Sequence, residues 1–288
     1  MYLLEKKMTD LQNQGNLLSQ YYRQPKIYIR LPSNGEFYPE GTLDQSENGE
    51  YAVYGMTAKD ELMFKTPDAL LSGQSTVEVI KSCVPAIKDP WQMPTLDVDT
   101  VLVAIRIATF GGMMEMSSTC TECTESNDYE LDLTNLLSSL GNIEYDSVID
   151  VDPLKVHIRP YTYREMTKTA LKTFEQQRIF QIINDDSMSD EQKVEMFGQS
   201  FVKITELSVD IIAGCIYAIE TPQGTVQDQA QIKEFINNTT KDTFDTISDH
   251  IQTMKGRNEI KPVDVTCAGC GHEYQQPFSM DQANFFDR

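Results

Sequence analysis

Apolar residues recur every three or four positions along several segments of this chain, and that spacing is typical of amphipathic helices. It predicts a helix over 98–111, where two glycines end the pattern, a long helix over about 163–184, and a second long helix that begins near 190. The last of these carries one apolar stripe: Val194, Phe197, Phe201, Ile204, Leu207, Ile211 and Cys215. We interpret the stripe as a core face, with a surface for a partner helix as the alternative.

Alternation of apolar and polar residues predicts short strands at 26–31, 51–56, 129–133 and 154–158. Shorter helices are expected at 58–83, with a break at Pro67, and at 134–141, 232–238 and 244–256. Turn-rich composition predicts a loop at 89–97, a hinge at 141–153 and a turn at 221–225. We therefore expect an α+β fold that is mostly α-helical, with short antiparallel strands.

Two short segments carry the same signal for the start of a helix. In "MTAKDEL" Thr57 precedes Asp60 by three positions, and in "PYTYREM" Thr162 precedes Glu165 by three positions. A threonine and an acidic residue at this spacing form a capping box, and the acidic side chain also suits the helix dipole. Because each segment follows a predicted strand, we interpret the two as copies of one supersecondary unit.

The chain has 288 residues, of which 44 are acidic and 24 basic, so its net charge is −20. Basic side chains that neutralise phosphates supply most of the affinity of a nucleic-acid binder, and this composition argues against that function. No apolar run is long enough to predict a membrane span. The N-terminal segment lacks the apolar centre of a secretory signal, so we expect a cytosolic protein with reduced thiols.

The six cysteines are of two kinds. Cys83 and Cys215 lie among aliphatic residues and are interpreted as small core side chains. The other four form two C-x-x-C pairs, each followed by a turn residue and then by an aromatic that opens a predicted strand: Cys120, Cys123, Cys267 and Cys270. Two such knuckles supply the sulfurs of a closed tetrahedral site, so we predict one structural Zn²⁺ in a zinc-ribbon-like site.

Three other uses of these thiols are less consistent with the pattern. A redox dithiol belongs at the start of a helix, whereas strands follow both pairs. Disulfides require an oxidising compartment, and a catalytic zinc keeps one position for water, which four cysteines would occupy. His272, two residues past Cys270, is a competing ligand that we expect to face solvent instead.

The sequence contains no catalytic motif of the common kinds, neither a phosphate-binding loop nor a Gly-rich dinucleotide turn nor a nucleophile elbow. Its three histidines, His157, His250 and His272, are interpreted as structural or exposed side chains. We therefore expect a protein that is not an enzyme.

Three segments, 29–41, 56–90 and 99–111, followed by "CTEC", resemble the baseplate hub and hub-assembly proteins of T-even-type contractile-tailed bacteriophages. The resemblance covers residues 26–135 and extends more loosely to 158–166 and the helices that follow. It implies a non-enzymatic role in virion assembly, as a subunit of the tail hub or as a chaperone, in the host cytoplasm and in the virion baseplate. Its implied partners are other hub or tail proteins, including the tape-measure protein. The alternative is a zinc-ribbon protein that binds nucleic acid or has a regulatory role.

These patterns divide the chain into four parts. Residues 1–25 form a polar N-terminal arm, either mobile or ordered on a partner. Residues 26–150 form an α+β half with the first knuckle, 151–258 a helical half, and 259–288 a strand–knuckle–strand tail that packs back on the first knuckle. A metal ion can join such distant segments, because the entropy of closing a loop grows only slowly with its length.

Overall fold

The structure is a computed structural model that describes residues 18, 21–65, 72–141, 144–183, 189–257, 260–278 and 285–286. Within these residues the helices are α2 (Ala58–Phe64), α4 (Gln74–Cys83), the short 3₁₀ helix η2 (Pro90–Gln92), α5 (Thr95–Phe110), α6 (Leu133–Ser139), α7 (Tyr163–Ile183), α8 (Asp190–Cys215), α9 (Gln229–Asn238) and α10 (Lys241–Arg257). The strands are β1 (Pro25–Ile29), β2 (Tyr51–Tyr54), β3 (Met113–Thr119), β4 (Ser126–Asp132), β5 (Val148–Val151), β6 (Leu154–Ile158), β7 (Ile216–Thr221), β8 (Gly224–Val226), β9 (Val263–Thr266) and β10 (Glu273–Gln276).

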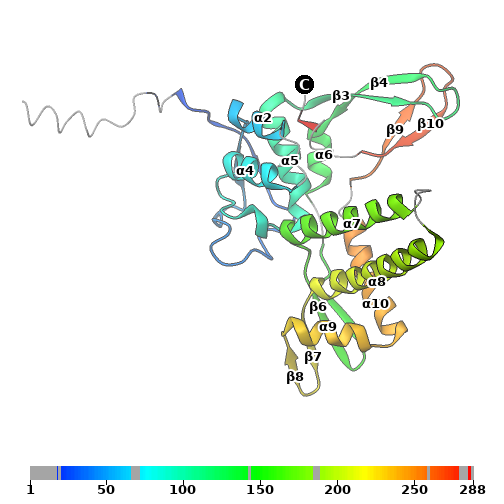
Figure 1. Cartoon of the computed structure of the whole chain (residues 1–288). Helices are drawn as coiled ribbons and strands as arrows, with labels where there is room; N and C mark the ends of the chain where they lie inside the picture. The colour runs from blue at the N-terminus through cyan, green and yellow to red at the C-terminus, as the bar shows by residue number, and fades with distance from the viewer. Residues whose placement is uncertain are drawn as a thin grey trace, which may run out of the picture.

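The first hydrophobic core is built around α5 (Figure 1). This helix is apolar on almost every side, and Val101, Leu102 and Ile105 are no more than 1 % exposed. A helix of this kind is stable only when other elements cover it all round. Residues of α2, α4, α6 and the antiparallel β1–β2 pair provide that cover, with Ile29 and Tyr51 opposite each other in the pair and both buried.

The C-terminal residues return to this first core. The ring of Phe286 stacks on Phe64 of α2 with 4.5 Å between the ring centroids. The guanidinium of Arg106 lies 5.4 Å from the ring centroid of Phe285, which is 2 % exposed. Burial of two aromatic side chains holds the end of the chain against elements from its first half.

The second core lies against the four-stranded antiparallel sheet β5-β6-β7-β8. Val156 of β6 pairs with Ile219 of β7, and both are buried. Ile232 of α9, Ile247 of α10 and Ile212 near the end of α8 belong to the same cluster. Helices from the same half of the chain therefore cover one face of the sheet.

Helices α7 and α8 form a long hairpin that extends to one side of the two cores (Figure 1). The apolar stripe of α8 is buried only toward its end: Cys215 is 5 % exposed, but Val194 and Phe201 are 73 % and 62 % exposed. The interpretation of this stripe as a core face is thus wrong for the N-terminal half of α8. The reason is that the described part of the chain leaves this half of the face to solvent.

Both predicted capping boxes form. The Thr57 hydroxyl accepts a hydrogen bond from the backbone N–H of Asp60, whose carboxylate accepts one from the backbone N–H of Thr57. Thr162 and Glu165 make the same two bonds. Each carboxylate also binds an arginine, at 3.4 Å in the first unit and at 2.7 Å in the second. The two helix starts therefore share one construction.

Several expected boundaries are corrected by the structure. Helix α5 begins at Thr95, because the expected loop at 89–97 already contains η2, capped by Asp89, and the first turn of α5. The expected hinge at 141–153 contains β5, which pairs with β6. Strand β3, which the alternation did not predict, precedes the first cysteine pair. The break predicted at Pro67 lies outside the described residues.

The division of the chain at residues 25, 150 and 258 stays a prediction. Residues 1–17, 19 and 20 of the expected arm lie outside the described part of the chain. Among the described helices, none combines the length and the apolarity that crossing a membrane requires.

Candidate metal centre

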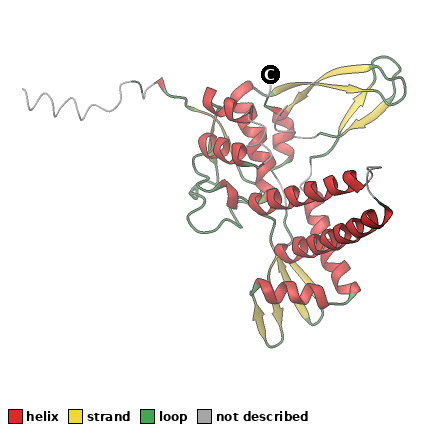
Figure 2. Cartoon of the chain, viewed as in Figure 1, coloured by secondary structure: helices red, strands yellow, loops and turns green. Residues whose placement is uncertain are grey.

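The two cysteine pairs occupy the turns of two β-hairpins. Strands β3 and β4 pair antiparallel, with Thr119 opposite Ser126 next to the turn, and β9 and β10 pair with Thr266 opposite Glu273 next to theirs. Figures 1 and 2 show the two hairpins together on one arm of the molecule, at the upper right. Segments about 150 positions apart in the sequence, as Cys120 and Cys270 are, thereby become neighbours.

The four cysteine sulfurs converge on one point. The Sγ atoms of Cys120 and Cys270 are 3.7 Å apart, those of Cys123 and Cys267 are 3.5 Å apart, and all four lie within 4.8 Å of one another. Sulfurs placed about 2.3 Å from a central zinc ion stand about 3.8 Å apart in a tetrahedron. A disulfide holds its sulfurs at about 2.05 Å. The cluster therefore has the size of a tetrahedral metal site, and not that of two disulfides.

The backbone folds the two cysteine turns in the same way. The N–H of Thr124 donates to the carbonyl of Cys120 at 3.0 Å, and the N–H of Gly271 donates to the carbonyl of Cys267 at 2.9 Å. In both turns the N–H of the first cysteine donates, at 2.9 Å, to the carbonyl five residues further on. Thr124 and Gly271 both have a left-handed backbone, with φ of 60° and 74°. The two knuckles are therefore conformational copies of each other.

One cysteine of each pair is buried and the other lies at the surface. Cys120 and Cys267 are 1 % and 2 % exposed, whereas Cys123 and Cys270 are exposed. The backbone N–H groups of Cys270 and Gly269 lower the pKa of the Cys267 thiol to about 6 from its ordinary value of 9.0. A thiolate is the form that binds metal ions. Without a metal, hydrogen bonds among the sulfurs raise the pKa of the Cys123 and Cys270 thiols, so Cys267 is the sulfur that most readily provides this form.

Asn127 of β4 connects the two hairpins beside the sulfurs. Its side chain is buried, and its amide nitrogen lies 3.6 Å from Sγ of Cys267 and 3.2 Å from the Tyr274 hydroxyl. Its amide oxygen accepts a hydrogen bond from the backbone N–H of Ala268 at 2.8 Å. The hydroxyls of Ser118 and Tyr274 are 2.6 Å apart and complete the network. An amide that donates to a thiolate stabilises its negative charge and orients it toward a metal.

Sequence reasoning did not identify Asn127 or Ser118. The two residues face each other across the β3–β4 pair and are both buried. Met114 and Met116 precede Ser118 on the same face of β3, where alternation requires apolar side chains. The signal in the sequence is a pair of polar residues on the apolar face of a hairpin, next to a cysteine turn. This signal would have identified Asn127 and Ser118.

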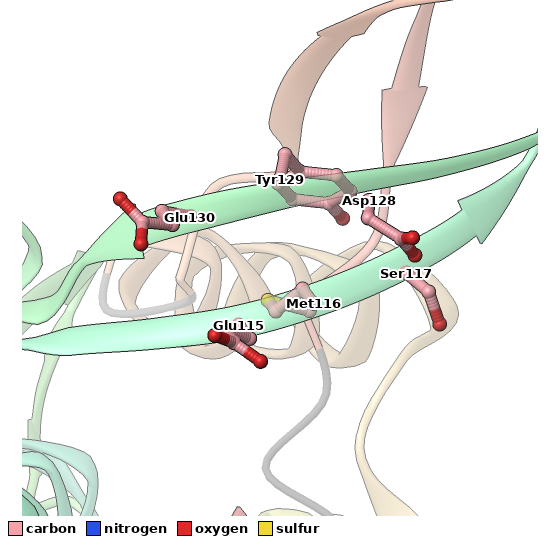
Figure 3. Close-up of a pocket in the computed structure, with 6 residues that line it drawn as sticks. All are labelled: Glu115, Met116, Ser117, Asp128, Tyr129 and Glu130. Carbon is pink, nitrogen blue, oxygen red and sulfur yellow. The ribbon is translucent and has the colours of Figure 1, made fainter.

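The outer face of the β3–β4 hairpin is acidic. Glu115 lies opposite Glu130 across the pair, and Ser117 lies opposite Asp128. Figure 3 shows these side chains, together with Met116 and Tyr129 of the same two strands, around an open recess. Negative charge beside the cysteines repels phosphates, so this surface disfavours the alternative of a nucleic-acid-binding zinc ribbon.

The other candidate residues lie outside the sulfur cluster. Cys83 and Cys215 are 0 % and 5 % exposed, in agreement with their prediction as core side chains. His157 lies beside an acidic side chain of β7, His250 contacts a backbone carbonyl at 3.0 Å, and His272 stacks on an aromatic ring. Within the described ranges, the four cysteines are the one group of His, Cys, Asp and Glu residues arranged to hold a metal ion.

The chemistry of this donor set is that of a closed site. Four thiolates around one point satisfy a tetrahedral ion and leave no position for a water molecule or a substrate. Soft sulfur ligands select zinc, copper(I) or iron, and disfavour magnesium and calcium. A site of this kind stabilises a fold and does not activate water.

A family model described as T4 bacteriophage base plate protein matches residues 28–287, which is nearly the whole chain. The chain therefore belongs to this family, and the match confirms the resemblance to phage baseplate proteins. Its description names the baseplate and does not single out the hub. Comparisons with curated proteins and with solved structures gave no match.

Proposed function

We propose that this chain is a non-enzymatic morphogenesis protein that acts in the assembly of the central hub of a phage tail baseplate, as a hub subunit or as an assembly chaperone. The observation that carries the proposal is the baseplate family match over residues 28–287. The protein acts through protein–protein contacts, in the host cytoplasm during assembly and in the tail baseplate. Its partners are other hub or tail proteins, with the tape-measure protein as a further candidate.

Two physical features support a role in assembly. The net charge of −20 keeps the chain soluble and can steer it toward basic partners. The α7–α8 hairpin presents large apolar side chains to solvent, among them Phe174 at 51 % and Phe201 at 62 % exposure. Exposed apolar surface of this kind marks sites of protein–protein interaction.

The proposal includes one structural Zn²⁺ bound by Cys120, Cys123, Cys267 and Cys270. The spacing of the sulfurs and the matched conformation of the two knuckles support it. We propose zinc because it accepts four thiolates in a tetrahedron and has no redox chemistry of its own. The ion would join the C-terminal hairpin to the middle of the chain and make a rigid, chemically inert docking body.

Mass spectrometry of finished virions, together with deletion of the gene, tests the role. A hub subunit is present in purified particles, and its loss leaves tails without a hub. An assembly chaperone is absent from the particles, and its loss also prevents hub formation. Normal hubs in the deletion, with the protein absent from virions, would contradict both forms of the proposal.

A further inference from the structure

The N-terminal half of α8 presents four apolar side chains on one face of the helix. Val194, Phe197, Phe201 and Ile204 follow one another at spacings of three, four and three residues. They are 73 %, 52 %, 62 % and 37 % exposed. Ser200, which points to a different side of the helix, is 2 % exposed. The apolar face is therefore turned outward along the hairpin that α8 forms with α7 (Figure 1).

The pattern of this face reads the same in both directions, as β-branched residue, Phe, Phe, β-branched residue. If two copies of α8 pair antiparallel about an axis level with Gln199, Val194 lies opposite Ile204 of the second copy and Phe197 lies opposite Phe201 of the second copy. Antiparallel helices pack through layers of this kind, in which a large side chain meets its counterpart. A partner of unrelated sequence would not require the stripe to have the same order of residue types in both directions. The pattern therefore favours a second copy of this chain.

Gly198 is an independent observation that favours the same pairing. It lies inside a helix of 26 residues, where glycine is less favourable than alanine. A Cβ atom at this position would meet nothing within 4 Å, so packing within the described chain does not require a glycine. It is next to the level of the proposed axis. A missing side chain there lets two helix backbones approach closely at their crossing point.

Charges near the stripe are placed so that they do not oppose the pairing. At about 100° per residue, Glu195, Lys203 and Glu206 are turned by 100° or more from the nearest side chain of the stripe. Gly198 and Thr205, which flank the stripe, carry no charge. In the register above, Thr205 lies opposite Lys193 of the second copy, so the lysine that flanks the stripe meets an uncharged side chain and not a second lysine.

The exposed area is sufficient for a reversible dimer. Taking about 200 Å² for a phenylalanine and about 120 Å² for an aliphatic side chain, the four side chains of the stripe offer roughly 360 Å² of apolar surface per copy. About 65 % of a homodimer interface is apolar, so the two copies would bury about 1,100 Å² in all. Specific interfaces begin at about 1,000 Å².

We propose that the chain forms a homodimer through antiparallel packing of this α8 face, defined by Val194, Phe197, Phe201 and Ile204, with Gly198 at the crossing. The dimer depends neither on the metal nor on the role in hub assembly. It gives the hairpin a function, because a two-fold contact through this face joins two copies of the chain.

The mass of the purified full-length protein tests the dimer. Light scattering at tens of micromolar and physiological salt should give twice the chain's 32.7 kDa, with dissociation on dilution. Phe201→Glu should give the mass of one chain and keep the far-UV circular dichroism of the wild type, because this side chain is exposed in the single chain. Leu62→Glu on α2, at 66 % exposure, is the matched control and should remain dimeric. A wild-type monomer at every concentration, or a Phe201→Glu dimer, overturns the proposal.

Cross-linking tests the antiparallel register. Oxidation of Gly198→Cys should produce a covalent dimer in which mass spectrometry identifies a peptide linked from residue 198 to residue 198. Gln199→Cys lies at the same level but points away from the stripe, and should give no 199–199 link. If α8 instead binds a different protein, the purified chain remains a monomer and neither variant cross-links through α8, which overturns the second copy as the occupant.

Discussion

Asn127 and Ala268 lie 141 positions apart in the chain, yet the side-chain oxygen of Asn127 accepts a hydrogen bond from the backbone N–H of Ala268 at 2.8 Å. Ala268 stands between the two cysteines of the second knuckle, and the amide nitrogen of Asn127 points at the sulfur of Cys267. One side chain of the middle hairpin therefore holds both the backbone and a sulfur of the C-terminal hairpin. The position of the second knuckle depends on it.

Replacement of Asn127 by leucine should weaken metal binding without removing a ligand. The variant keeps the approximate volume of the side chain but loses the donor to Cys267 and the acceptor for Ala268. Partners of metal ligands typically contribute 10- to 100-fold to affinity. We expect a loss of about that size in zinc affinity, measured by competition with a chromophoric chelator. Asn135→Ala, an exposed amide on α6, is the control and should bind as tightly as wild type.

The matched φ angles of Thr124 and Gly271 predict opposite effects of two substitutions. A left-handed backbone is unfavourable by roughly 1–2 kcal/mol for a residue with a Cβ atom. Gly271→Ala should lower the free energy of unfolding by about 1 kcal/mol, through the backbone alone, because a Cβ atom there meets nothing within 4 Å. Thr124→Gly should raise it by up to about 1 kcal/mol.

Chemical denaturation at constant metal content measures both changes. Gly256→Ala in α10 is the control: its Cβ atom also meets nothing within 4 Å, but its backbone is helical, so stability should stay the same or rise. If Gly256→Ala lowers the free energy of unfolding as much as Gly271→Ala does, the left-handed backbone at residue 271 is not the cause of the destabilisation.

Asp97 makes the stability of the first core depend on pH. Its carboxylate is fully buried in the first turn of α5 and accepts hydrogen bonds from the hydroxyl and the backbone N–H of Ser33 and from the Tyr38 hydroxyl, at 2.6, 2.8 and 2.9 Å. Burial raises the pKa of Asp97 to about 6, and these hydrogen bonds oppose the rise. Because the unfolded chain has a lower pKa, near 3.9, the native state binds the proton more tightly between these two values.

The stabilisation from protonated Asp97 is therefore complete below about pH 4 and is lost as the pH rises through about 6. We expect the free energy of unfolding of wild type, minus that of Asp97→Asn, to fall by about 1–3 kcal/mol between these limits, at 1.36 kcal/mol per pKa unit. Urea denaturation at a series of pH values measures the difference. The subtraction removes the titration of the other carboxylates, and a difference that rises with pH would refute the assignment.

The site could be predicted from local patterns only in part. Spacing and flanking turn residues identified Cys120, Cys123, Cys267 and Cys270, because a knuckle is a local structure that a few residues specify. The role of Asn127 depends on which hairpin lies beside it, and that information is tertiary. Strand β3 was missed because three methionines and two serines between 113 and 118 give only a weak alternation.

The fold shows the same division between local and tertiary information. The capping boxes at Thr57 and Thr162 were predicted, since each is formed within a few residues. The stripe of α8 has a correct period, but a period does not tell whether a face is covered by the same chain or turned to solvent. Cys215 is covered and Val194 is not, although both belong to one stripe.

Removal of two ligands should destabilise the protein. In the proposed zinc site the metal closes the loop between positions 123 and 267, and without Cys267 and Cys270 it cannot do so. By analogy with a cross-link across a loop of this length, Cys267→Ser with Cys270→Ser should lower the free energy of unfolding by about 3–5 kcal/mol, or Tm by roughly 10 °C. Thermal denaturation measures this change in stability. The control is Ala268→Ser, which adds a hydroxyl between the two cysteines without removing a sulfur and should be as stable as wild type.

Zinc content is the most direct test of the metal centre. The chain is purified without added metal, and its zinc content is measured by elemental mass spectrometry. X-ray absorption spectroscopy then determines the ligands of the metal and their distances. We predict one zinc per chain, bound by four sulfurs at about 2.3 Å, and none in the double serine variant. A wild-type protein that is folded and free of zinc, or a zinc ion with nitrogen or oxygen ligands, would contradict the account.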